Sequence, residues 1–313
     1  NVIASPAGRA GCDVCHRGQA ILAAWGVEGP FVEQNAADHQ PITCAVCHDP
    51  HNGRYDGQLR FPVNTRSIEE HLCARCHNRR TVPAPGSHGL TPHAPEAALL
   101  LGDAGHFFEG TNVDPGRIIS THGSEANPTL CAGCHVNSFE VTDPTTGGFV
   151  FSSKGHLFEA IPCLDERGVP IPGGDCAVTA EARSFDGCTG GACHGSEQVA
   201  AGILTVVSGE IEHTAEQLIA MLQVVDPNLA AAGGEIDGAN AEFTVAEGAF
   251  FNYNLAHFGD NEFRSAATHN PFLIRALLLS SIQRVQERYG VAPPAFMNPA
   301  GELRRLLDRA PSH

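Results

Sequence analysis

The sequence is poor in the residues from which a large side-chain core is usually built. Aromatic residues make up only 6% of its 313 residues, with three tyrosines and a single tryptophan, Trp25. Glycine and proline, at 34 and 21 residues, are frequent and scattered along the chain. We therefore expect a source of apolar bulk other than side chains, such as a bound group.

The sequence also lacks long apolar runs and an excess of positive charge. No run approaches the roughly 20 apolar residues that cross a bilayer, and the apolar patches around 97–101 and 272–279 are short. No signal-peptide pattern precedes the first cysteine, Cys12, so we expect the mature form of an exported protein. The 35 acidic and 19 basic residues give a net charge of −16. This charge excludes nucleic acid and anionic membranes as natural partners.

Cysteine, in contrast, is abundant and regularly placed. Ten of the twelve cysteines form five pairs, each followed directly by histidine. We call them motif I (Cys12, Cys15, His16), motif II (Cys44, Cys47, His48), motif III (Cys73, Cys76, His77), motif IV (Cys131, Cys134, His135) and motif V (Cys188, Cys193, His194). Two residues separate the cysteines in motifs I to IV, and four separate them in motif V.

The pattern C-x-x-C-H is typical of covalent haem attachment. Both thiols form thioethers with the haem vinyl groups, and the adjacent histidine binds the iron as its proximal ligand. A single motif is also compatible with a zinc half-site or a redox dithiol. Zinc, however, needs the pairs to combine and gives no role to a histidine after each pair. The recurrence therefore predicts five haem c groups, and for motif V the alternative is a structural disulfide or a metal loop.

Two cysteines lie outside the motifs, Cys163 and Cys176. Haem attachment takes place in an oxidising compartment, where disulfides persist. Twelve residues separate these two cysteines in a segment rich in proline and glycine, and neither is followed by histidine. We predict a disulfide between them and no sixth haem.

The second axial ligand determines what each haem can do. An open position binds small ligands, whereas a second histidine restricts the haem to electron transfer. Twelve histidines lie outside the motifs and five are needed, which favours two histidines on every iron. The predicted distal ligands are His39, His51, His93, His122 and His156, with His71, His88, His106 and His269 in reserve. For any one of them the alternative is a surface residue or a partner of a haem propionate.

The five motifs occupy residues 12–194, too densely for each haem to have its own domain. We predict a mostly irregular fold with little β-structure, in which short α-helices wrap round a packed chain of haems. Residues 1–195 form a five-haem-binding region and residues 196–313 a haem-free, mainly helical cap or assembly region. Apolar spacing in the second region predicts helices over 210–225, 246–256 and 272–289, and a short strand at 203–207.

Charge changes sign within the second region. From Ser184 to Phe263 there are twelve acidic residues and neither Lys nor Arg, and from Arg264 onward there are seven Arg and three acidic residues. One interpretation is a solvated acidic face beside a basic helix. The other is a pair of complementary ends that steer the docking of partners or of further copies of the chain.

The motifs, the CHDPH run at 47–51, the GHLF run around His156 and HNPFLIRALL from His269 together resemble multihaem c-type cytochromes of metal-reducing prokaryotes. Among these the chain is most similar to small extracellular cytochromes that polymerise into conductive filaments. The resemblance implies haems stacked in parallel and T-shaped pairs, and a histidine donated from one subunit to a haem of the next.

The predicted function is electron transfer through five bis-histidine haems, without catalysis, in an extracellular or periplasmic protein. The leading form is a filament subunit, whose partners are other redox proteins, copies of itself and extracellular electron acceptors. Alternatives are a monomeric periplasmic shuttle and a subunit that feeds electrons to a reductase. A multihaem reductase with one open haem is the remaining possibility, and it requires a five-coordinate iron.

Overall fold

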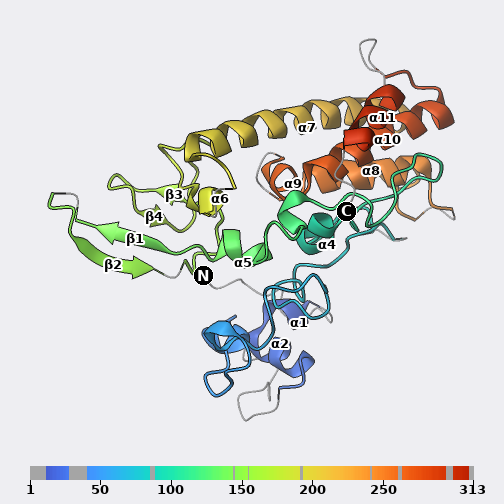
Figure 1. Ribbon diagram of the computed structural model, residues 1–313. Helices are drawn as coiled ribbons and strands as arrows, with labels where there is room; N and C mark the ends of the chain where they lie inside the picture. The colour runs from blue at the N-terminus through green and yellow to red at the C-terminus, as the bar shows by residue number, and fades with distance from the viewer. Residues whose placement is uncertain are drawn as a thin grey trace. The chain divides into compact units, whose positions relative to one another are not determined.

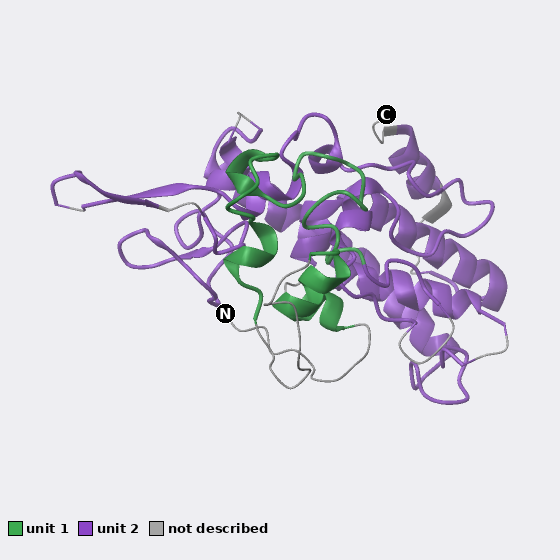
Figure 2. Cartoon of the chain, turned by 90° about the horizontal axis from the view of Figure 1, so that it is seen from below, with its two compact units in different colours: residues 1–78 green, residues 79–313 purple. Residues whose placement is uncertain are grey.

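The computed structural model describes residues 12–27, 41–84, 89–143, 145–153, 155–190, 193–239, 242–259, 263–293 and 299–309. The chain forms two compact units, residues 1–78 and 79–313, which we call unit 1 and unit 2 (Figure 2). Residues 79–195 therefore pack with residues 196–313 in one unit. The predicted division at residue 195 separates a haem-binding region from a haem-free one, which is a different division from that between the two compact units. It stays a prediction.

Unit 1 consists of short helices joined by turns. Its elements are α1 (Asp13–His16), α2 (Gly18–Ala24), α3 (Cys44–Cys47) and the 3-10 turn η1 (Asp56–Gln58). Aromatic packing adds to these elements, because the Arg75 guanidinium lies 3.7 Å from the centroid of the Phe61 ring, and Trp25 meets that ring edge-on at 5.1 Å. A cation over an aromatic face is a favourable contact. Trp25, Phe61 and Arg75 therefore form one small cluster that stabilises unit 1.

The first part of unit 2 is a series of short elements. They are α4 (Glu96–Leu101), the 3-10 turn η2 (Thr121–Gly123), α5 (Leu130–His135), β1 (Phe139–Thr142), β2 (Phe149–Ser153), β3 (Cys163–Leu164), β4 (Pro170–Ile171) and α6 (Asp186–Thr189). Strands β1 and β2 form an antiparallel hairpin, with Phe139 opposite Ser153, that projects away from the helices of the unit (Figure 1). Strands β3 and β4 form a second, smaller antiparallel pair.

The second part of unit 2 is helical and holds its apolar core. It comprises α7 (Glu197–Val225), α8 (Val245–Ala256), α9 (Arg264–His269), α10 (Pro271–Tyr289) and α11 (Pro299–Arg309). Helix α10 contacts the other four (Figure 1). Leu218 of α7, Phe251 of α8 and Leu277 of α10 are fully buried in this core.

Local signals start the main helices where they begin. The Ser196 hydroxyl accepts a hydrogen bond from the backbone N–H of Val199 and caps α7. A capping box formed by Thr244 and Glu247 starts α8, and Asn270 caps α10 just before Pro271. The side-chain oxygens satisfy backbone donors that have no partner within the helix. The predicted helices at 246–256 and 272–289 are confirmed by α8 and α10, and the one at 210–225 is the second half of α7.

The predicted strand at 203–207 is wrong, because these residues lie inside α7. Ala200, Ala201 and Leu204 are buried at helical spacing, and the packing of this face outweighs the strand preference of valine and isoleucine. Among the described helices, none is both long and apolar enough to span a membrane.

The acidic and basic stretches of the sequence meet within unit 2. Arg275 of α10 forms an ion pair of 2.9 Å with Glu210 of α7, and both side chains are exposed to solvent. An exposed pair of this kind contributes less than about 1 kcal/mol. It agrees with the interpretation of a solvated acidic face beside a basic helix.

Candidate haem sites

The haem motifs share one backbone geometry. In a standard motif the chain makes a single helical turn, and the histidine N–H donates to the carbonyl oxygen of the first cysteine. This bond is 3.2 Å for His16 to Cys12, 2.8 Å for His48 to Cys44 and 3.0 Å for His77 to Cys73. Residues three and four apart on such a turn lie on the same side, which is where two thioethers and an axial histidine must converge.

Motif V closes in the same way despite its two additional residues. The N–H of His194 donates to the carbonyl oxygen of Cys188 at 3.2 Å. Cys188 and Cys193 both lie within the described part of the chain, and they are not joined in a disulfide. The turn is enlarged while its ends stay as in motifs I to III, which favours haem attachment over the disulfide alternative.

The motif thiols that show a shift have raised pKa values. Burial raises the pKa of Cys188 to about 11, helped by the nearby Cys134 and Glu197. Burial likewise raises the pKa of Cys47 and of Cys134. A raised pKa keeps a thiol protonated and unreactive, which is not the environment of the attacking cysteine of a redox dithiol. Motifs IV and V lie close together, because Gly187 beside Cys188 packs against the backbone of Cys134.

The proximal histidine of motif II is held by the backbone of unit 1. Its Nδ1 lies 2.6 Å from the carbonyl oxygen of Gly57. The guanidinium Nε of Arg60 donates to the carbonyl of Ala45 at 2.9 Å, and its backbone N–H donates to that of Cys47. An Nδ1–H bonded to a carbonyl fixes the tautomer in which Nε2 binds the metal.

His71 has a structural role in motif III. Its Nδ1 accepts hydrogen bonds from the backbone N–H groups of Cys73 and Ala74, at 3.1 and 3.4 Å. Its Nε2 donates to the carbonyl of Val63 at 3.0 Å, and the side chain is buried. Because both ring nitrogens are bonded to the backbone, the structure favours a positioning role for this reserve candidate, and its assignment as a ligand stays a prediction.

Two pairs of histidine rings lie close together in unit 2. His135 of motif IV and His269 at the end of α9 have ring centroids 6.2 Å apart and planes inclined by 14°. His194 of motif V and His122 in η2 have centroids 6.2 Å apart and planes inclined by 64°. Each pair combines a proximal histidine with a histidine from outside the motifs.

Backbone carbonyls hold three of these four rings. Nδ1 of His135 lies 3.0 Å from the Phe158 oxygen, that of His269 lies 2.8 Å from the Ser265 oxygen, and that of His122 lies 2.6 Å from the Thr268 oxygen. Burial lowers the pKa of His194 and of His269, which favours the neutral form of each imidazole. Neutral imidazoles with Nδ1 bonded to the protein are ready to bind metal through Nε2.

The spacing of both pairs suits one metal ion between the rings. An imidazole nitrogen binds a transition metal at about 2 Å and the ring centroid lies about 1 Å behind it, so two axial imidazoles have centroids about 6 Å apart. The separation of 6.2 Å is common to both pairs while the inclination differs. A shared separation fits ligation of one iron by both rings, because the angle between two ligand planes can differ while their distance stays the same. The residues present therefore fit haem at motifs IV and V.

The other predicted distal ligands are distributed over both units. The side chains of His51, His93 and His156 are exposed, and their assignment stays a prediction. His39 lies outside the described residues, as do His88 and His313. His106 packs edge-on against Phe108 at 4.4 Å, and burial lowers its pKa to about 4. Sequence reasoning placed His269 only among the reserve ligands. The signal that could have found it is its place directly before the helix start at Asn270-Pro271, which fixes where its backbone lies.

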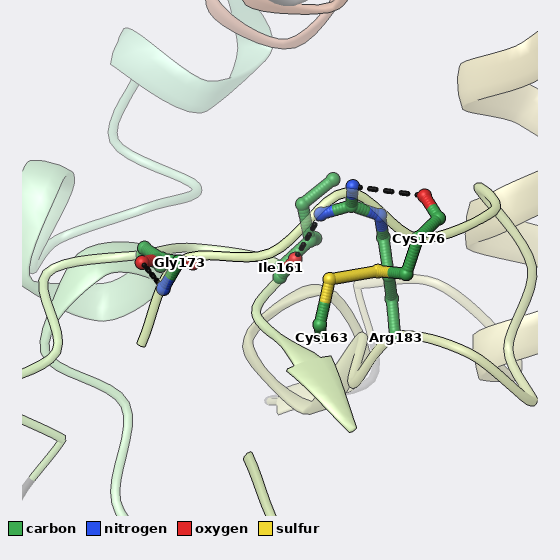
Figure 3. Close-up of a disulfide and its surroundings, with 6 residues drawn as sticks. Ile161, Cys163, Gly173, Cys176 and Arg183 are labelled. Atoms are coloured by element: carbon green, nitrogen blue, oxygen red, sulfur yellow. Dashed lines mark hydrogen bonds between the residues drawn. A yellow bond between two sulfur atoms is a disulfide. The ribbon is translucent and has the colours of Figure 1, made fainter. Parts of the chain in front are cut away.

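The predicted disulfide between Cys163 and Cys176 is confirmed (Figure 3). Arg183 stabilises the loop that this disulfide closes. Its guanidinium donates hydrogen bonds to the carbonyls of Ile161 and Cys176, each at 3.0 Å. The loop leads from the β1–β2 hairpin to motif V, so the disulfide stabilises the approach to that haem site.

Comparison with known proteins supports the chemistry of the motifs. A family model described as a doubled CXXCH motif matches residues 36–81, which contain motifs II and III. The match covers motifs II and III, whose CXXCH pairs imply covalently bound c-type haem, the chemistry of electron carriers. No curated protein and no solved structure matches the chain.

Proposed function

We propose that the protein transfers electrons through five bis-histidine c-type haems. The observation that carries this proposal is the pair of facing histidines at motifs IV and V, each at a spacing that suits an iron with two axial ligands. The common turn geometry supports extending haem attachment to motifs I, II, III and V. The fold proposed for the loaded protein is a chain of packed haems with short helices and loops around it.

A bound haem with two histidine ligands supplies reversible one-electron chemistry and has no open position for a substrate. The chain contributes the covalent anchors, the axial histidines and the carbonyls that orient them. It also contributes two neighbouring sites, because Gly187 beside motif V packs against the backbone of Cys134 in motif IV. Close neighbouring sites suit passage of electrons rather than storage at isolated centres.

The arrangement favours an electron carrier over a reductase. Reduction of a substrate at haem requires a free axial position, and at motifs IV and V a second histidine faces the proximal one. We propose an extracellular, polymerising conduit as the form of the carrier, supported by the resemblance to filament-forming cytochromes. A monomeric periplasmic shuttle or an electron-feeding subunit is the alternative. The disulfide supports an oxidising compartment for all three.

Haem content and ligation test the proposal directly. The protein is produced with the haem-attachment machinery, and its intact mass and pyridine haemochrome are measured. We expect five haems per chain, with low-spin spectra in both oxidation states and no binding of cyanide or nitrite. A high-spin ferric signal from the intact protein would contradict bis-histidine ligation at all sites. Fewer than five haems, with motif V unmodified, would remove the expanded motif from the proposal.

Assembly is tested separately by negative-stain electron microscopy of the secreted protein. Filaments of regular repeat are expected for the conduit. Globular particles alone, in oxidised and in reduced samples, would favour the shuttle and leave haem ligation unaffected.

A further inference from the structure

Helix α9 ends where two haem sites of unit 2 come together. His269, its last residue, faces His135 of motif IV. The residue before it, Thr268, accepts through its carbonyl the hydrogen bond from Nδ1 of His122. His122 in turn faces His194 of motif V. Adjacent residues of one short helix therefore contact the distal sides of both sites.

We propose that the corner between α9 and α10, residues Thr268, His269 and Asn270, is a single clamp for the distal ligands of two haems. His269 is the distal ligand at motif IV, and His122, oriented by Thr268, is the distal ligand at motif V. The proposal rests on the proposed function, because it requires haem at both motifs. The pairing is crossed, since His122 lies just before motif IV in the sequence but serves motif V.

Asn270 makes the corner rigid. Its side chain is fully buried, and its amide donates to the carbonyls of Leu99 and Ile118 at 3.0 and 2.8 Å. Its side-chain oxygen accepts the N–H of Leu273 at 3.0 Å. One residue thus fixes the start of α10 to α4 and to the segment that leads into η2. Buried amides with all partners satisfied hold such a junction in one geometry.

The segment that carries His122 is held equally firmly. The backbone N–H of His122 donates to the Ser120 hydroxyl, and its carbonyl accepts from the Asn127 amide at 2.8 Å. Gly123 packs so closely on α4 that a Cβ there would come within 2.6 Å of the Leu100 carbonyl oxygen. The backbone around both proposed distal histidines is therefore fixed by the protein, and the clamp connects the two positions.

The two orientations give a spectroscopic signature. Near-parallel axial imidazoles give a rhombic low-spin ferric EPR signal, and strongly inclined ones give a highly anisotropic signal with a larger maximum g value. The angle of 14° at motif IV and of 64° at motif V predicts one signal of each kind. Each signal can then be assigned by removing one distal histidine.

The test compares EPR spectra of the oxidised, haem-loaded protein and its variants. We expect His269→Ala to convert one haem in five to high spin and to remove a rhombic signal. His122→Ala should also convert one haem, but remove a highly anisotropic signal. Added imidazole should restore low spin in both variants. The matched control is His213→Gln on the exposed side of α7, which should leave the spectrum unchanged.

Asn270→Ser tests the clamp itself, because serine can still cap α10 but cannot reach both carbonyls. We expect it to shift both assigned signals while haem content stays the same. A shift of one signal alone would show that the sites are independent, and would overturn the clamp.

The ligand assignment can fail without the proposed function. If His269→Ala and His122→Ala keep five low-spin haems, other residues bind these irons and the assignment is wrong, although electron transfer still stands. If the wild-type protein holds no covalent haem, the proposed function fails. Should His269→Ala not accumulate, His269→Met serves instead, and its thioether ligand should keep the haem low-spin and raise its reduction potential. An unchanged set of potentials in that variant would also overturn the assignment.

Discussion

Units 1 and 2 carry similar numbers of haem motifs but differ in how they bury apolar surface. Unit 1 holds three motifs in 78 residues, and the apolar side chains it buries, among those described, are Ile21, Leu22, Val46, Leu72 and Ala74. Unit 2 holds two motifs, and its helices α7, α8 and α10 bury a continuous core that includes Ile211, Leu218, Phe251 and Leu277.

The difference indicates what haem does in each unit. A chain of fewer than 80 residues with so few buried side chains rarely folds without a cross-link, a metal or another bound group. Under the proposed function, the haems supply the interior of unit 1. In unit 2 the helices bury a core of side chains, and the residues of motifs IV and V and their neighbouring histidines lie on or beside α5, α6, α9 and η2.

Producing the protein without haem is expected to have the largest effect on stability, and to destabilise unit 1 more than unit 2. In protein made without haem-attachment machinery, residues 1–78 should be cleaved by protease roughly tenfold faster or more than the core helices α7, α8 and α10. Limited proteolysis followed by mass spectrometry measures this ratio, with the haem-loaded protein as control. Equal resistance of both units would show that the side chains of unit 1 are sufficient, and would break the comparison.

Truncating one buried leucine in each unit sharpens the comparison. Leu277 is fully buried in α10 and Leu72 is 6% exposed in unit 1. Leu277→Ala should lower the free energy of unfolding by about 2–5 kcal/mol, because a cavity forms among fixed helices. The loss of unfolding free energy caused by Leu72→Ala should lie at or below the lower end of that range. Denaturation followed by far-UV circular dichroism measures both, and a larger loss for Leu72→Ala would contradict the assignment of the main core to unit 2.

The disulfide is expected to contribute about 3 kcal/mol, all of it in unit 2. A cross-link between residues 13 apart removes that much loop-closure free energy from the unfolded chain. The double variant Cys163→Ser and Cys176→Ser should show this loss in chemical denaturation of the helical signal. Protease sensitivity of residues 1–78 should not change, and an increase there would show that the two units are coupled.

Acid should destabilise unit 2 through His106 by roughly 2 kcal/mol between pH 7 and pH 4. Burial lowers the pKa of His106 to about 4, below its ordinary value of 6.5. As the pH falls through this window, the unfolded chain binds the proton first and stability is lost, whereas above pH 6.5 the full stability is present. Unfolding curves of wild-type protein and His106→Gln measure the difference. The same slope in both would assign the acid sensitivity to other groups.

The helices and the haem anchors were predictable because their signals are local. Asn270-Pro271 and the Thr244–Glu247 box start α10 and α8, and each proximal histidine adjoins its cysteines in the sequence. The strand predicted at 203–207 was wrong because a local preference competed with the packing of a long helix. The distal ligands carry no such local signal. His269 lies beside His135 only because α9 packs there. The number of candidate histidines could therefore be read from the sequence, but not which histidine belongs to which motif.

The Cys163–Cys176 disulfide also completes the account of the cysteines. The sequence has twelve cysteines, and the proposed haems use them in pairs. The disulfide of Cys163 with Cys176 accounts for two and leaves ten, the number that the five motifs use. Arg183 holds the loop from both sides, so that no cysteine outside the motifs is left as a free thiol beside motif V.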